Sequence, residues 1–258
     1  MKAFICILGA VSDEIAGIKQ RMKIERKHVW GSITAFEGEW EGYGLLLVRT
    51  GVGAGRAVEA LKKSLAEFPV VMVLTVGYAG GTDPELKLGD LVLAERVLRL
   101  IPPDSESGEQ SEPFRMIPLD PALVSQAMVL SCPPETAVHR GALMTVDEVV
   151  SRPEDKQALA RDHQALAVDM ETFDLVEYAR REAMSILSIR AISDTAEQEL
   201  IDLTHLVKES GEPDFLKAGW HVLTHPGDLK HALSLRNQSR LATRNLTEFL
   251  AEFLRKLQ

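Results

Sequence analysis

Short apolar segments alternate along the chain with longer segments of helical period, and this alternation predicts strands and helices in one sheet. The segment 70–76 is a continuous apolar run, which is typical of a central strand buried on both faces. The expected strands are 4–9, 32–37, 44–50, 70–76, 89–99, 138–146, 166–168 and 185–192. The expected helices are 13–22, 54–68, 121–130, 153–162 and 172–183. The pattern therefore predicts a protein of the α/β class with a mixed sheet.

Three further segments break this alternation. Residues 77–81, Gly-Tyr-Ala-Gly-Gly, are predicted to leave the preceding strand and form a loop with room for a ligand, because glycine permits backbone angles that other residues resist. The polar segment 102–113 has the composition of a surface loop. The near-helical spacing of apolar residues from about 226 to 258 predicts a long helix that packs on the rest of the chain. We therefore expect residues 1–258 to form a single domain with a C-terminal helical extension.

Composition and charge narrow the class of protein. The chain has 258 residues, of which 45% are hydrophobic and 26% charged, which is ordinary for a globular protein. Its net charge of -9 argues against nucleic acid or an anionic membrane surface as a partner. Cys6 and Cys132 lack the spacing of a zinc site and are too few for a disulfide framework, so we expect free thiols and no metal or cofactor. No apolar run reaches the length of a membrane helix, and a cytoplasmic location is expected.

Acidic residues stand where two of the predicted strands end. The segment 167–172, Ala-Val-Asp-Met-Glu-Thr, and the segment 189–194, Ile-Arg-Ala-Ile-Ser-Asp, both leave an apolar run at a carboxylate. Ligands of open α/β sheets bind outside the carboxyl ends of the strands. Carboxylates held there can protonate a leaving group, orient a sugar or activate water, so the chain is predicted to be a small-molecule enzyme.

An ordered set of five motifs resembles a known family. They are Leu-Gly-Ala at 8–10 with Asp13-Glu14, Thr-Gly-Val-Gly at 50–53, Val-Gly-Tyr-Ala-Gly-Gly at 76–81 with Leu-Gly-Asp at 88–90, Val-Asp-Met-Glu at 168–171, and Arg-Ala-Ile-Ser-Asp at 190–194. This set resembles the purine and uridine phosphorylase superfamily, most closely its methylthioadenosine/S-adenosylhomocysteine nucleosidases. The resemblance implies a three-layer α/β/α fold around a central mixed, twisted sheet, cleavage of a purine nucleoside, and homodimers or larger homo-oligomers.

The resemblance also implies roles for single residues. Asp194 matches the acid that protonates or hydrogen-bonds the imidazole nitrogen of the purine, although an aspartate here is also a common helix cap. Glu14 matches the carboxylate that activates water, and Arg190 the arginine that places the water or an anion. Glu171 matches the carboxylate that binds the ribose hydroxyls, and Met170 the side chain that packs on the sugar. An ion pair of Arg190 with Glu171 or Glu14 is an equally simple structural explanation for the arginine.

The expected walls of the substrate site depart from the nucleosidase pattern. Tyr78 stands where those enzymes usually carry serine, and Val149 stands in a segment where they carry an aromatic that stacks on adenine. Ala79, Val150 and Ser193 complete the substrate-binding residues that we expect. Because of these departures, the sequence does not determine which nucleoside and which 5′ substituent the site binds.

Whether water or phosphate attacks the sugar depends on an anion site. Hexameric phosphorylases have an arginine two residues before the first glycine of the 77–81 segment, and here that position is Thr75. Hydrolysis is therefore favoured, and phosphate remains a possible second substrate because the turn 51–53 offers backbone amides to an anion. The long C-terminal helix is similar to that of less characterised superfamily members, including phosphorylases linked to hopanoid lipid synthesis. A non-catalytic nucleoside-binding module is the remaining alternative.

Overall fold

The computed structural model describes residues 2–100, 114–130, 132, 136–200 and 228–257, and it places their strands in one mixed sheet of ten strands. The strands are β1 (Phe4–Gly9), β2 (Lys23–Trp30), β3 (Ile33–Trp40), β4 (Tyr43–Arg49), β5 (Val70–Gly81), β6 (Leu91–Leu100), β7 (Phe114–Pro118), β8 (Val138–Thr145), β9 (Ala165–Asp169) and β10 (Ile186–Asp194). The helices are α1 (Ser12–Arg21), α2 (Ala54–Glu67), α3 (Pro121–Met128), α4 (Pro153–His163), α5 (Thr172–Arg181) and α7 (Asp228–Lys256).

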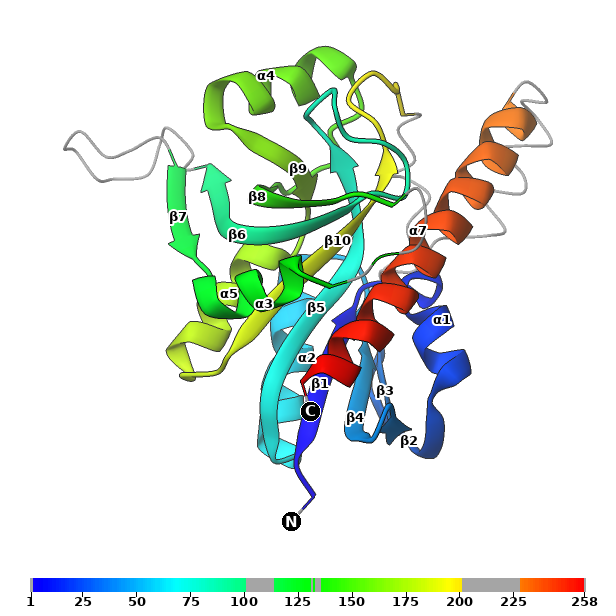
Figure 1. Ribbon diagram of the computed structural model, residues 1–258, viewed down its shortest axis with the longest axis vertical. Helices are drawn as coiled ribbons and strands as arrows, with labels where there is room; N and C mark the ends of the chain where they lie inside the picture. The colour runs from blue at the N-terminus through cyan, green and yellow to red at the C-terminus, as the bar shows by residue number, and fades with distance from the viewer. Residues whose placement is uncertain (1, 101–113, 131, 133–135, 201–227, 258) are drawn as a thin grey trace.

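β5 pairs with both β1 and β10, and these three strands lie side by side in the sheet (Figure 1). β1 pairs in parallel with β4 and β5, and β10 pairs in parallel with β5. The carboxyl ends of these three strands therefore lie at the same edge. β9 crosses the far end of β5, where Gly80 pairs with Val168. This arrangement brings the 168–171 and 190–194 segments together at one edge, as the sequence predicts.

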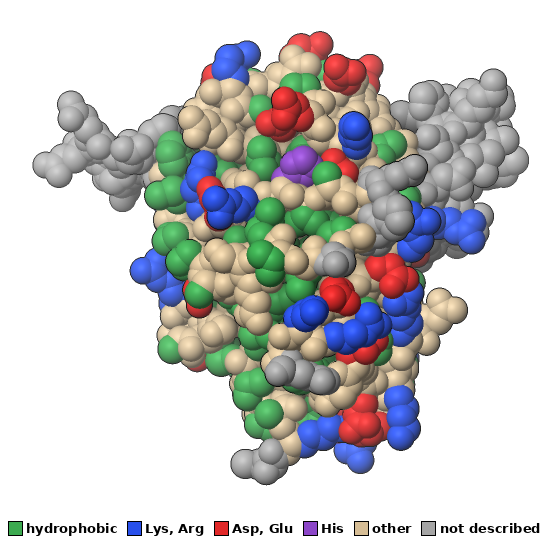
Figure 2. All heavy atoms as spheres, viewed as in Figure 1, with side chains coloured by type: hydrophobic (Ala, Val, Ile, Leu, Met, Phe, Trp, Pro, Cys, Tyr) green, Lys and Arg blue, Asp and Glu red, His purple; other side chains and the backbone are tan. Residues whose placement is uncertain are grey.

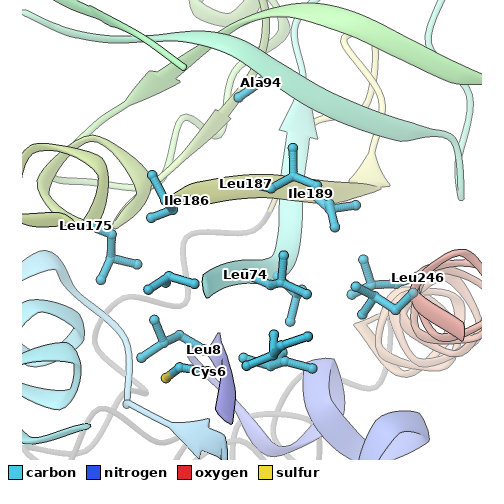
Figure 3. Close-up of a cluster of buried hydrophobic side chains, with 14 of the residues drawn as sticks. Cys6, Leu8, Leu74, Ala94, Leu175, Ile186, Leu187, Ile189 and Leu246 are labelled. Atoms are coloured by element: carbon cyan, nitrogen blue, oxygen red, sulfur yellow. The ribbon is translucent and has the colours of Figure 1, made fainter. Parts of the chain in front are cut away.

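Helices cover both faces of the central strands, so the three-layer fold is confirmed. α1 and α7 pack on one face, and α2 and α5 pack on the other. Figure 3 shows the core between these layers, with Leu8 and Leu74 between Leu175 of α5 and Leu246 of α7. All four side chains are buried. α7 continues this contact with Phe249 and Phe253, which are also buried, so the predicted C-terminal helix is part of the core.

The structure corrects the prediction that the strand ends at Val76. β5 continues to Gly81, and its last residues pair with β10, with Gly77 opposite Arg190 and Gly80 opposite Asp194. The glycines are needed for space. A Cβ atom on Gly77 would lie 2.6 Å from Glu14 Oε1, and one on Gly80 would lie 2.9 Å from Asp194 Oδ2. The glycine segment is thus a strand that carboxylates approach closely.

Most of the other predicted elements are confirmed within one to three residues at their ends, and two strands, β2 and β7, were missed. β2 is an edge strand whose side chains are largely exposed, so its sequence, Lys-Ile-Glu-Arg-Lys-His-Val-Trp, carries no apolar alternation. The predicted loop at 102–113 lies outside the described residues. Cys6 and Cys132 are both free.

The surface carries charges of both signs. On the face shown in Figure 2, blue and red side chains are interspersed beside α7. Arg21 of α1 pairs with Glu248 of α7, and Arg255 of α7 pairs with Glu41. None of the helices in the described ranges is long and apolar enough to cross a membrane.

Candidate active site

Two neighbouring cavities open at the carboxyl ends of the central strands. The larger has a volume of about 240 Å³, and nine of the ten residues proposed from the sequence line it. They are Glu14, Tyr78, Ala79, Val149, Val150, Met170, Glu171, Ser193 and Asp194. The smaller has a volume of about 10 Å³ and is lined by Glu14, Glu171 and the tenth residue, Arg190. Glu14 and Glu171 border both cavities, so they lie between them.

Glu14 is held in place by backbone amides. It lies in the first turn of α1, directly after β1, and its side chain is buried. Its Oε2 accepts hydrogen bonds from the N–H groups of Ala10 at 2.6 Å and Val11 at 3.0 Å, and its Oε1 accepts one from Tyr78 at 2.9 Å. Burial raises the pKa of Glu14 above its ordinary value, against the lowering effect of these amides. The carboxylate is therefore fixed in position and favoured as a proton acceptor.

Arg190 is paired with Asp169, which the sequence analysis left without a role. Its Nε donates to Asp169 Oδ2 at 2.9 Å, and its Nη2 donates to Thr75 Oγ1 at 3.0 Å and Thr172 Oγ1 at 2.6 Å. The structural explanation that paired Arg190 with Glu171 or Glu14 was therefore wrong. Within the described residues, Nη1 is buried without a hydrogen-bond partner.

That unpaired nitrogen lies beside Glu14. A Cβ atom added to Gly77 would be 3.1 Å from Arg190 Nη1 and 2.6 Å from Glu14 Oε1, so both groups border the same glycine. Arg190 and Glu14 also line the same small cavity. A buried donor that protein groups leave unpaired is costly, and such donors are commonly satisfied by water or a ligand. The small cavity is thus a polar site with a donor and an acceptor.

Glu171 directly precedes helix α5 and faces the turn after β4. Its Oε1 accepts a hydrogen bond of 2.7 Å from the N–H of Gly53, whose φ of 107° is favourable only for glycine. Burial, and then the negative charge of Asp169, raise the pKa of Glu171 to about 7. The backbone amide at Gly53 is therefore occupied by a carboxylate of the protein itself.

Asp194 ends β10 and makes a buried ion pair that the sequence analysis missed. Lys156 of α4 is fully buried, and its Nζ donates to Asp194 Oδ2 at 2.6 Å. Ser193 Oγ donates to Asp194 Oδ1 at 2.8 Å. These two contacts, rather than a helix N-terminus, hold the Asp194 carboxylate. The sequence signal for Lys156 is weak, because α4 is polar overall and only the spacing to Leu159 and Ala160 places the lysine on its inner side.

Tyr78 and Val149 line the large cavity with different kinds of side chain. The Tyr78 hydroxyl shares a hydrogen bond of 2.6 Å with Thr243 Oγ1 and donates to the Ser239 carbonyl at 3.3 Å, so its hydroxyl is tied to α7. Burial raises the pKa of Tyr78, which keeps this hydroxyl protonated. Val149 is 43% exposed at the rim of the large cavity. The cavity therefore has a fixed aromatic on the α7 side and an open aliphatic edge.

Known proteins resemble this chain in sequence and in fold. A 5′-methylthioadenosine/S-adenosylhomocysteine nucleosidase of Aeromonas salmonicida is 28% identical over 205 residues, which cover 76% of this chain and 88% of that protein. The same enzyme of Streptococcus pneumoniae, solved with a transition-state inhibitor, matches with a TM-score of 0.76 and 20% identity over 99% of this chain and 100% of that one. Futalosine hydrolase of Helicobacter pylori matches with a TM-score of 0.75 and 19% identity over 97% of each chain. A model of the phosphorylase superfamily matches residues 4–218, and the chain belongs to that superfamily.

Proposed function

We propose that this protein is a purine nucleosidase that cleaves the N-glycosidic bond of an adenine-type nucleoside by attack of water. The observation that carries the proposal is the small cavity, in which Glu14, Glu171 and Arg190 surround about 10 Å³ beside the larger cavity that Asp194 lines. That volume is close to the space of a single water molecule. The curated relative from Aeromonas salmonicida, a 5′-methylthioadenosine/S-adenosylhomocysteine nucleosidase, supports the same reaction class.

Glu14 is proposed to take the proton of the attacking water. Its raised pKa suits it to this task, and its three backbone hydrogen bonds fix its direction. The unpaired Arg190 Nη1 borders the same space and is placed to donate a hydrogen bond to the water oxygen. Water held between the donor and the acceptor would lie next to the sugar, in the geometry that the reaction requires.

The other end of the reaction is the departing base. Cleavage passes through a sugar with oxocarbenium character, so the base must gain a proton or a strong hydrogen bond as its bond to the sugar lengthens. Asp194 is proposed to provide this contact at the imidazole ring of the purine. Glu171 is proposed to bind the ribose hydroxyls through the oxygen that Gly53 does not occupy, and Met170 to pack against the sugar.

Two observations favour water over phosphate. Thr75, at the position where hexameric phosphorylases carry arginine, already accepts a hydrogen bond from Arg190. The Gly53 amide, which an anion would need, already donates to Glu171. Phosphorolysis, including a role like that of the hopanoid-linked phosphorylases, is the alternative that the assay below distinguishes.

The assay offers the purified protein adenosine, 5′-methylthioadenosine and S-adenosylhomocysteine, with and without phosphate. We expect adenine and free sugar to form equally well in both conditions. Sugar phosphate that forms only when phosphate is added would replace hydrolysis by phosphorolysis. If no nucleoside releases its base, the non-catalytic binding module is the correct interpretation. A 7-deazaadenosine substrate is the control, because it lacks the imidazole nitrogen and should resist cleavage.

We further propose that residues 1–258 form a single domain that acts in the cytoplasm as a homodimer or larger homo-oligomer. The main apolar core contains residues from Phe4 to Leu254, which supports the single domain. The two free cysteines fit a reducing compartment. Exposed apolar side chains at Val29, Val71 and Met116 are available for a subunit contact. Light scattering of the purified protein tests the assembly.

A further inference from the structure

We propose that Lys156 positions Asp194 for catalysis and supplies, through it, the proton that the departing base takes up. This inference rests on the proposed nucleosidase function. Lys156 is fully buried on α4, 38 residues before Asp194 in the chain, and does not line the large cavity, whereas Asp194 does. The lysine therefore does not reach the substrate and acts through the aspartate.

A buried lysine calls for an explanation, because removing an ammonium from water is costly and an apolar residue usually serves packing as well or better. Here the ammonium has three acceptors. Nζ donates to Asp194 Oδ2 at 2.6 Å, to the Thr195 carbonyl at 3.0 Å and to the Gln198 carbonyl at 2.9 Å. The three N–H groups of Lys156 are thus all used, and one is aimed at the residue proposed to meet the base.

The hydrogen bonds place the mobile proton on the lysine. Asp194 Oδ1 accepts from Ser193 Oγ and Oδ2 accepts from Lys156 Nζ, so both carboxylate oxygens act as acceptors in this arrangement. As the bond between the sugar and the purine breaks, its electron pair moves onto the base. Asp194 takes a proton from Lys156 and passes one to the imidazole nitrogen, which leaves a neutral amine, a carboxylate, a neutral purine and a cationic sugar. The total charge is unchanged, and the proton that Glu14 removes from water later balances the one given to the base.

The experiment must distinguish the supply of a proton by Lys156 from a purely structural role of the same residue. The lysine also ties the turn 195–198 to α4, and Leu200 just after that turn lines the large cavity. Removing the lysine could therefore disturb the cavity wall without any effect on proton transfer. K156Q suits the test, because its amide can still donate to the two carbonyls but carries no proton to give. K156M is the second variant, in case glutamine is not tolerated at the buried site.

The first measurement is the kinetics of 5′-methylthioadenosine cleavage by the wild type, K156Q, D194N and the double variant. We expect K156Q to lower kcat by about 10²-fold, the usual scale of general acid catalysis, with KM within about threefold. Because Lys156 acts through Asp194, adding K156Q to D194N should cause no further loss. K63M, which removes a partly exposed lysine of α2, is the matched control and should have the kcat of the wild type. A kcat of K156Q within about threefold of the wild type, or two losses that multiply in the double variant, would overturn the proposal.

The second measurement compares 5′-methylthioadenosine with its 2-fluoro derivative. Fluorine withdraws electrons from the purine, so the fluorinated base leaves with less need of a proton. We expect the ratio of kcat for the fluorinated to the parent substrate to be about tenfold higher in K156Q than in the wild type. A disturbed cavity wall slows both substrates alike, and an unchanged ratio would therefore reduce Lys156 to a structural residue. If the wild type itself releases no base, it is the proposed function that fails.

Discussion

The two ends of the large cavity hold their carboxylates in different ways. At the Asp194 end, the carboxylate is bound to the buried ammonium of Lys156 and to the hydroxyl of Ser193. At the Glu14 end, Glu14 and Glu171 accept hydrogen bonds from backbone amides. A backbone amide carries no net charge, so burial prevails at the Glu14 end and raises the pKa of both glutamates.

This difference separates two opposite proton tasks within one cavity. A buried glutamate with a raised pKa readily accepts a proton from water, whereas a carboxylate paired with an ammonium has a proton within reach to pass on. Enzymes commonly assign acid and base roles by giving similar groups different surroundings. Asp169 also lines the large cavity and follows the paired pattern, but its partner is the guanidinium of Arg190, and this ion pair keeps the arginine in position. The surroundings, more than the residue types, therefore distinguish the proposed roles.

The largest effect is expected from D194N, which removes the carboxylate at the paired end. Loss of the proposed acid should lower kcat by about 10³-fold while substrate analogues still bind. The variant also leaves Lys156 buried without its partner, which should lower the free energy of unfolding by about 3–5 kcal/mol. Steady-state kinetics and chemical denaturation measure the two effects. Near-normal turnover would remove Asp194 from the proposed role.

E14Q makes the corresponding change at the end held by amides. We expect kcat to fall by about 10²-fold, because the amide of glutamine cannot take the proton of water. No buried cation loses its partner, although the new NH₂ group must face one of the three backbone donors, so the stability loss should be only about 1–3 kcal/mol. D13N, one residue earlier and exposed, is the control. If E14Q is destabilised as much as D194N, the two ends of the large cavity do not hold their carboxylates in different ways.

G77A tests the same end through the backbone. A Cβ atom at this position would lie 2.6 Å from Glu14 Oε1 and 3.1 Å from Arg190 Nη1, so both groups must move. A displacement of about 1 Å in such a site can cost about 10²-fold in rate, and we expect a loss of that order in kcat. G55A, in helix α2 with open space around its Cβ, is the matched control and should be about 0.5–1 kcal/mol more stable than the wild type. Equal activity of the two variants would show that the close approach at Gly77 is not needed.

The local sequence pattern was sufficient to predict the helices and strands that depend on it. β1, α2 and β8 follow from apolar periodicity and turn residues, and the superfamily motifs brought Glu14, Glu171 and Asp194 to one cavity. The strand character of residues 77–81 could not be found in this way, because it depends on the space that Glu14 and Asp194 occupy beside the glycines. A single sequence does not distinguish a glycine that is required for the close approach of a side chain from a glycine that is required for a turn.

The partners of the site residues were harder to predict than the residues themselves. Lys156 and Asp194 are 38 positions apart, and Arg190 and Asp169 are 21 apart, so neither pair leaves a local signal. Asp169 was noted only as an acidic strand end, and Lys156 lies on a helix that is polar overall. Ion pairs of this kind depend on how strands and helices pack, which a single sequence specifies only through the whole fold.

The smallest effect on activity is expected from E171Q, and both its activity and its stability should depend on pH. The pKa of Glu171 is raised to about 7, so between its ordinary value and pH 7 the folded protein holds a proton that the unfolded chain has released. The free energy of unfolding should therefore fall as the pH rises through this window, by up to about 3 kcal/mol for this group. E171Q removes that dependence, and it should be more stable than the wild type at pH 8 and equally stable at pH 4.

The same variant should show the opposite trend in binding. Ribose hydroxyls donate to a carboxylate more strongly than to a carboxylic acid, so the KM of the wild type should decrease as the pH rises through 7. E171Q should have a KM about tenfold higher at pH 8 and no such trend, because one charged hydrogen bond is worth about 1.5–3 kcal/mol. Thermal unfolding and KM measured across pH 5 to 9 check both signs together. A wild-type KM that does not change with pH would contradict the binding of ribose by a Glu171 carboxylate whose pKa is raised to about 7.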